Sequence, residues 1–154
     1  MTVGIAFTLH LIAINIWVGG MFFVVVVFSH VTAPMPLAQR LNYWHRALSR
    51  FFMLVWLAML VLLGSGGVMI YEVFGSPINS PLYVLLMASF ALIMITIFIY
   101  IYFLPYRHFT RYLQAQDFTN AEYWLQQLRR LGKLNTGLGL CVVIIIGIGS
   151  HYLF

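Results

Sequence analysis

Four long apolar stretches follow one another along the chain, and shorter polar segments separate them. A helix that crosses the ~30 Å hydrocarbon layer of a bilayer needs about 20 mostly apolar residues. Each stretch reaches that length, and we therefore predict transmembrane helices at 4–29, 51–72, 81–104 and 134–154. The predicted fold class is all-α, with residues 1–154 forming one integral membrane domain, a four-helix up-and-down bundle.

The segment after the first span predicts an amphipathic helix at the membrane surface. Pro34 and Pro36 cannot continue the first helix. In segment 37–50 apolar side chains recur at helical spacing with arginines between them, at Leu37, Leu41, Trp44 and Leu48. We expect this segment to lie along the interface, with Trp44 in the aromatic belt at the level of the headgroups.

Two sequence features mark the ends of the polar segment between the last two spans, residues 105–133. Pro105 is expected to end the third span, because proline breaks a helix interior. The letters TNAE, Thr119 to Glu122, fit a capping box, with a hydroxyl first and a carboxylate three residues later. We predict an amphipathic helix over 119–133 that continues directly into the fourth span.

The composition supports a membrane protein and gives no indication of nucleic acid binding. Hydrophobic residues make up 63% of the 154 residues and charged residues only 7%, whereas about a quarter of a soluble domain is charged. All eight lysines and arginines fall in segments 30–50 and 105–133, which border the same side of the predicted bundle. The positive-inside rule assigns that side to the cytoplasm, so both termini face the periplasm. The basic side chains there suit anionic lipid headgroups.

The five histidines are the main candidates for chemistry, and the predicted topology sorts them by depth. His30, His45 and His108 lie at the cytoplasmic edge, where we expect solvated imidazoles. His10 lies about two turns inside the first span. His151 lies at the end of the fourth span, on the same side of the membrane as His10.

One predicted helix face in the first span carries His10, Ala13, Trp17, Met21 and Val24. These positions recur every three or four residues, so they share a face, which we expect to point into the bundle. A buried imidazole needs a hydrogen-bond partner or a metal, and an ionisable group within a span marks a functional site by default. Trp17 and Met21 therefore join His10 and His151 as candidate cofactor-binding residues.

Two chemistries suit these residues, and the choice between them stays open. Neutral histidine binds haem iron axially, and gaps between bundle helices hold cofactors. Histidine with methionine suits copper, and soft thioethers favour the cuprous ion. For copper the candidate ligands are His10, His151 and Met69, while Met1 and Met87 lie on the same outer side.

Other motifs are few. The three acids, Glu72, Asp117 and Glu122, are scattered, and no catalytic constellation is present in the sequence, so enzyme activity is left open. The letters GSGG, Gly64 to Gly67, predict tight helix packing, self-association or a place in a larger membrane complex.

The chain resembles the small CopD-like family, named after the copper resistance protein D domain. The resemblance rests on LHLIAINIWVGGMFF in the first span, SRFF opening the second, FLPYRHF closing the third and LRRLGKLNTGLGL entering the fourth. It covers nearly the whole chain. It implies a multi-pass protein of the bacterial inner (plasma) membrane that handles copper.

A weaker similarity is to the HemJ-like protoporphyrinogen oxidases, which are membrane proteins that bind haem b. The matching residue is His10, followed by tryptophan and small residues. Those oxidases also carry a histidine and a lysine at the start of the third helix. This chain reads SPLYVLLMAS there, with Tyr83 and Leu85 near the two places, and that departure counts against the oxidase assignment.

The sequence thus favours a protein that handles copper at a periplasm-side histidine and methionine site. A haem b redox protein with His10 as axial ligand is the first alternative. A non-catalytic accessory membrane subunit is the second.

Overall fold

Helix makes up nearly all of the fold. The computed structural model of the protein describes residues 1–152, and for Ile78 and residues 149–152 it describes the backbone alone. No strand occurs among these residues, so the all-α prediction is confirmed. Along the chain the elements are α1 (Thr2–Ile14), η1 (Asn15–Gly19), α2 (Gly20–Phe22), η2 (Phe23–Phe28), α3 (Ser29–Thr32), α4 (Leu37–Phe74), η3 (Pro77–Asn79), α5 (Leu82–Ile101), η4 (Tyr102–Tyr106), α6 (Arg107–Gln114) and α7 (Phe118–Tyr152).

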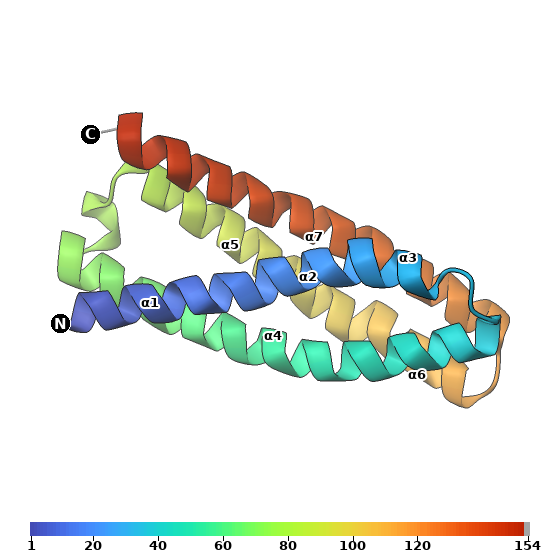
Figure 1. The fold of residues 1–154 in the computed structure, drawn as a ribbon. Helices are drawn as coiled ribbons and strands as arrows, with labels where there is room; N and C mark the ends of the chain where they lie inside the picture. The colour runs from blue at the N-terminus through green and yellow to red at the C-terminus, as the bar shows by residue number, and fades with distance from the viewer. Residues whose placement is uncertain (153–154) are drawn as a thin grey trace.

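These elements join into four helical rods, each long and apolar enough to cross a membrane. The first rod comprises α1 to α3, the second is α4, the third comprises α5 to α6, and the fourth is α7. Turns of π-helix, at η1, η2 and η4, lie within the first and third rods. The start of α1 and the end of α7 lie at one end of the bundle, here called the terminal end, and the short links before α4 and α7 lie at the other, the loop end (Figure 1).

The prediction that Pro105 ends the third span is wrong. The rod continues through the proline and ends at Gln114. Pro105 is buried within η4, where the backbone is π-helical. A proline ring clashes with the preceding turn of a regular α-helix, and the wider π-helical turn relieves that crowding.

The amphipathic segment 37–50 is part of α4 and does not form a separate surface helix. Its apolar face turns inward, and Leu41 and Leu48 belong to the core. Trp44 is 2% exposed, and its indole N–H donates to Thr32 Oγ1 at 3.0 Å. Trp44 is therefore a core residue, and its assignment to the aromatic belt is wrong. The physical reason is that α3 and α4 meet at this end of the bundle and cover its ring.

The helix that opens with segment 119–133 continues into the fourth span as predicted, but its cap is a different residue. α7 begins at Phe118, and Asp117 accepts the backbone N–H of Asn120 at 3.1 Å and the side-chain amide of Asn120 at 2.6 Å. The predicted capping box over Thr119 to Glu122 is therefore wrong. The hydrogen bonds from the side chain and the backbone of Asn120 favour the ionised form and lower the pKa of the Asp117 carboxyl.

Glu122 has a structural role in place of capping. Its carboxylate lies 3.1 Å from Arg40 Nη2, and this ion pair joins α7 to the start of α4 at the loop end. The other basic residues lie in the loop-end half of the rods, as their sequence positions require. The assignment of that end to the cytoplasm stays a prediction.

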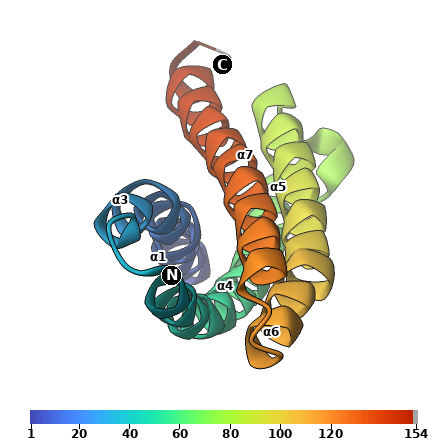
Figure 2. The same cartoon turned by 90° about the vertical axis from the view of Figure 1, so that its right-hand side faces the viewer.

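The rods associate as two antiparallel pairs. The first rod packs along α4, and α5 packs along α7 (Figure 1). The two pairs meet at the loop end and diverge toward the terminal end, as both views show (Figures 1 and 2). The aromatic core lies where they meet, with Phe52 packing edge-to-face on Phe98 at 5.5 Å and on Tyr106 at 4.9 Å between ring centroids.

Gly139 marks a close approach of α7 to the first rod. A Cβ atom at this position would lie 2.8 Å from a methyl carbon of Val18 and 3.2 Å from the Met94 methyl carbon. Only glycine leaves room for that contact, in the way small residues permit close packing of membrane helices. At Gly137, two residues earlier on the same helix, an added Cβ atom would have no neighbouring atom within 4 Å.

Gly139→Ala is expected to destabilise the bundle by about 1–3 kcal/mol, because the added methyl group overpacks the contact with Val18. The matched control is Gly137→Ala, which adds a methyl group in open space and is expected to be neutral or stabilising by up to ~1 kcal/mol through helix propensity. Thermal unfolding in detergent, followed by circular dichroism, compares the two. Equal effects at the two positions would contradict the close approach.

Asp117→Ala is expected to lower the unfolding temperature at neutral pH, because α7 loses its cap. Folding lowers the pKa of this carboxyl below its value in the unfolded chain, which is near 4. The cap therefore stabilises the protein fully above that pH, and the contribution is lost as the pH falls through the pKa of the folded state. The difference between wild type and Asp117→Ala should therefore shrink in acid. Asp117→Asn, which still caps, and Thr119→Ala serve as controls and should both stay close to the wild type at neutral pH.

Candidate functional site

A cavity of about 290 Å³ lies between the two helix pairs, in the half of the bundle where they diverge. Its walls come from all four rods, and they are almost entirely apolar. The lining includes His10, Trp17, Gly66, Met87, Met94 and Gly139. The sequence therefore identified two of the cavity's main residues, His10 and Trp17, on one helix face.

His10 is held by a hydrogen bond to the neighbouring rod. Its Nδ1 lies 2.9 Å from the hydroxyl oxygen of Ser65, which is buried on α4. The same oxygen lies 2.6 Å from the carbonyl oxygen of Val61. A hydroxyl has one hydrogen and a carbonyl oxygen has none, so Ser65 donates to Val61 and accepts from His10. This arrangement favours the neutral tautomer with its proton on Nδ1, in which Nε2 carries a lone pair.

Gly66 allows the imidazole to lie against α4. A Cβ atom at this position would lie 3.4 Å from Cε1 of His10. That separation is an ordinary van der Waals contact, so the tight packing predicted for the GSGG letters stays a prediction. Gly64 and Gly67 have no atom within 4 Å of the point where a Cβ would lie.

Trp17 also lines the cavity. The side chain is 3% exposed, and its Nε1 is covered and has no hydrogen-bond partner within the described part of the chain. It lies in η1, a π-helical turn, and such turns frequently occur at functional sites.

The third rod supplies two thioethers at about the depth of His10. The first and third rods run in the same direction, and the rings of Trp17 and Phe98 are in contact with centroids 6.0 Å apart. His10 and Ala91 each lie seven residues before that contact on their own helix. The two residues are therefore at a similar depth along the bundle. Met87 and Met94 are one helical turn to either side of Ala91, and all three residues line the cavity.

Met94 was missed by the sequence analysis, although a signal was present. Met87 and Met94 are seven residues apart, which puts them on one face of a helix. The sequence alone does not show which face of this almost uniformly apolar helix turns inward, and only the packing of α5 against the first rod selects it.

The other predicted site residues lie elsewhere. Met21 is buried, but it lines a second pocket of about 10 Å³ nearer the loop end. Met69 is half-buried near the terminal end of α4 and is not part of the cavity wall. The side chain of His151 lies outside the described residues.

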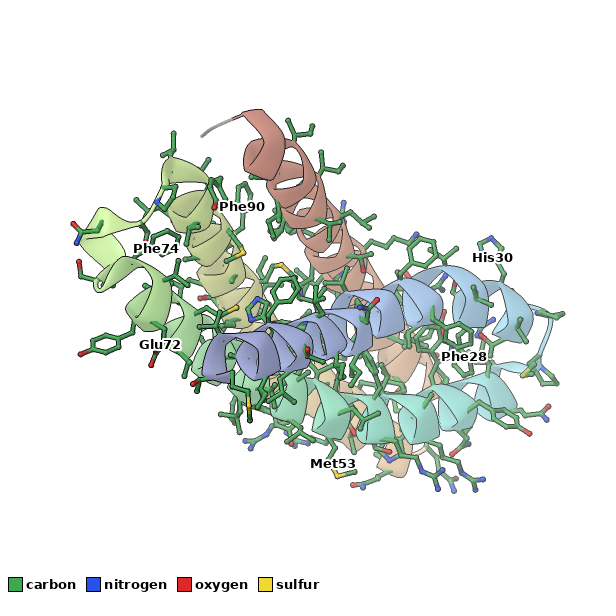
Figure 3. The ribbon with its side chains drawn as sticks, turned by 60° about the vertical axis from the view of Figure 1, so that its left-hand side comes forward. Phe28, His30, Met53, Glu72, Phe74 and Phe90 are labelled. Carbon is green, nitrogen blue, oxygen red and sulfur yellow. The ribbon has the colours of Figure 1, made fainter. Side chains whose placement is uncertain are left out.

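The three remaining histidines differ in their surroundings. His30 is exposed and points away from the helices (Figure 3). His45 and His108 are half-buried, and Nδ1 of His45 is covered, so the prediction of a solvated imidazole is wrong for His45 and stays a prediction for His108. His45 stacks on Tyr106 with centroids 6.3 Å apart, and His108 stacks on Trp124 at 4.5 Å.

The donor groups of the cavity fit copper better than haem. No group of three histidine, cysteine or acidic side chains that could hold a metal occurs in the described part of the chain. A metal in the cavity would therefore need the methionine sulfurs, which suit the cuprous ion. A haem would bring two propionates, and the cavity wall has no cationic side chain to pair with them.

The comparisons with known proteins agree with a role in copper handling. A family profile described as copper resistance protein D matches residues 45–148. No curated protein and no solved structure matches the chain. The matched residues include most of α4, the third rod and most of α7, and they leave out the first rod with His10. Because the match covers more than half of the chain, the protein belongs to the copper resistance protein D family.

Proposed function

We propose that the protein binds a cuprous ion in the cavity, with His10 Nε2 and the sulfurs of Met87 and Met94 as ligands. The observation that carries the proposal is the free lone pair of Nε2, which follows from the hydrogen bond between Nδ1 and Ser65. An imidazole held in this tautomer is a ready metal ligand. Met87 and Met94 take the place of Met69, because they line the same cavity as His10.

The charge of the site supports a cuprous ion over a divalent one. The proposed ligands are all neutral, and no carboxylate lines the cavity. Divalent magnesium, calcium and manganese prefer oxygen ligands, whereas soft thioethers select Cu(I). A single positive charge also costs less to bury in an apolar site than two.

Aromatic side chains pack between the cavity and the loop end. Trp17 packs on Phe98, and Phe98 packs on Phe52, with centroids 6.0 Å and 5.5 Å apart. Beyond them, the guanidinium of Arg129 lies 5.7 Å over the ring of Trp44. Packed rings and a fixed positive charge both oppose the passage of a cation. We therefore propose that copper enters and leaves at the terminal end, which the positive-inside rule assigns to the periplasm.

The ligand set is tested by anaerobic titration of the purified protein with Cu(I) against a chromogenic chelator. We expect one Cu(I) per chain, loss of binding in His10→Ala, and about tenfold weaker binding in Met87→Leu and in Met94→Leu. The matched control is Met53→Leu, because Met53 is 68% exposed on the outer face of α4. Unchanged Cu(I) binding in His10→Ala would refute the site. Loss of Cu(I) binding in Met69→Leu, with Met87→Leu and Met94→Leu unaffected, would show that Met69 is the ligand, as predicted from the sequence.

Ser65→Ala tests the tautomer. Without the hydroxyl, His10 Nδ1 loses its acceptor, and the imidazole is free to rotate and to protonate at either nitrogen. Loss of such a supporting hydrogen bond typically weakens metal binding by about 10–100-fold. Ser65→Thr retains a hydroxyl and should restore most of the affinity in the same titration. Wild-type affinity in Ser65→Ala would show that the hydrogen bond does not position the ligand.

A further inference from the structure

The outer surface of the loop end carries four exposed arginines from two neighbouring rods. They are Arg46 and Arg50 of α4 and Arg107 and Arg111 of α6, here together called the arginine surface. α4 and α6 are in contact, and His45 of α4 stacks on Tyr106 with ring centroids 6.3 Å apart. Arg46 and Arg107 directly follow these two residues, so they lie at the same level of the bundle.

No carboxylate of the described residues forms an ion pair with the arginine surface. The one ion pair found there joins Arg40 to Glu122, and the carboxylate of Asp117 accepts hydrogen bonds from Asn120. The third acid, Glu72, lies near the terminal end of α4 (Figure 3). The four positive charges are therefore left for a partner outside the chain, and charge complementarity favours an anionic one.

The arginine surface borders apolar side chains that face the lipid. On α4, the exposed Met53 follows Arg46 and Arg50 at helical spacing, so the three share one face. Figure 3 shows Met53 on the outer side of the helix. On the third rod, the exposed Phe103 lies four residues before Arg107. A molecule that covers both kinds of surface therefore has an anionic part next to an apolar part.

The direction of one arginine side chain supports an anion at this boundary. The guanidinium carbon of Arg107 lies 4.8 Å from the centroid of the Phe103 ring, which is about one turn closer to the middle of the bundle. Arg107 thus extends toward the apolar surface and away from the end of the rod. A guanidinium held there is partly removed from water, and a neighbouring anion offsets that cost. The phosphates of phospholipids lie at this level of a bilayer, beside the hydrocarbon layer.

We propose that the arginine surface binds an anionic phospholipid, with Arg46 and Arg107 holding its phosphate between α4 and α6. The acyl chains then lie over the apolar side chains of Met53 and Phe103. Arginine suits a phosphate because its guanidinium presents several N–H donors in a fixed fork. The sequence shows only that all basic residues share one end, and the packing of α4 on α6 selects these two. The proposal does not rest on copper binding, since none of these residues lines the cavity.

The experiment measures lipid binding to the detergent-purified protein by native mass spectrometry. The probes are dioleoylphosphatidylglycerol, which is anionic, and dioleoylphosphatidylcholine, which has the same chains and no net charge. We expect the wild type to bind phosphatidylglycerol more tightly. The double variant Arg46→Gln/Arg107→Gln should bind it roughly 25-fold more weakly, as for two side chains that each contribute about fivefold. Its affinity for phosphatidylcholine should stay unchanged.

The matched control is Arg130→Gln/Lys133→Gln, which removes the same charge from two exposed residues of α7 outside the arginine surface. It should weaken phosphatidylglycerol binding by no more than about twofold, because salt screens charges that do not contact the lipid. Arg46→Lys/Arg107→Lys keeps both charges and should retain most of the affinity. Circular dichroism shows whether each variant keeps its helices.

Three results would overturn the lipid proposal and leave the copper proposal intact. The first is equal affinity of the wild type for the two lipids, a comparison that holds even if a variant does not fold. The second is equal weakening in the two glutamine double variants, which would mean that the lipid responds only to the overall charge of the loop end. The third is displacement of phosphatidylglycerol by soluble polyglutamate at the same concentration of negative charge, which would show that the surface prefers an acidic protein segment.

Discussion

One hydrogen bond between the first two rods, from His10 Nδ1 to Ser65 Oγ, determines what the cavity can bind. Ser65 has its single hydrogen committed to the Val61 carbonyl, so it can only accept from the imidazole. The bond thereby favours one ring orientation and the tautomer in which Nε2 carries the lone pair. It also joins α1 to α4 inside the apolar layer, where a hydrogen bond between helices has no competition from water.

The cavity exists because the bundle is packed unevenly along its length. At the loop end, interlocking aromatic rings and the Arg40–Glu122 ion pair hold the four rods together. Toward the terminal end the pairs diverge, and the facing side chains of α5 and α7 are mostly small or flexible at the cavity wall. Gly139 lines the cavity and lets α7 approach Val18 of the first rod closely.

The match to the copper resistance protein D family covers the last three rods, whereas the imidazole of the site comes from the first. The family segment therefore supplies the two methionines, the serine that orients His10 and the glycines of α4 and α7. The first rod adds the imidazole of His10. The chemistry proposed for the site arises from the contact between these two parts, because neither part holds both the imidazole and the two methionines of the cavity wall.

The sequence by itself determined the membrane class, the four helices and the inward face that carries His10, Trp17 and Met21. These properties depend on the length of each apolar stretch and on the helical repeat, and both can be read from consecutive residues. It also placed His10 and Met87 on the same side of the membrane. The resemblance stated from its motifs agrees with the family that the profile match shows.

Only the tertiary structure decided which partners meet. Ser65 is 55 residues from His10, and Met94 was indistinguishable from lipid-facing residues until the packing of α5 was known. The course of the third rod through Pro105, the capping of α7 by Asp117 and the burial of Trp44 likewise depend on local backbone adjustment and on neighbouring rods. The physical reason is that a nearly uniform apolar helix carries no periodic signal for its inner face, so the register between helices is set by side-chain packing alone.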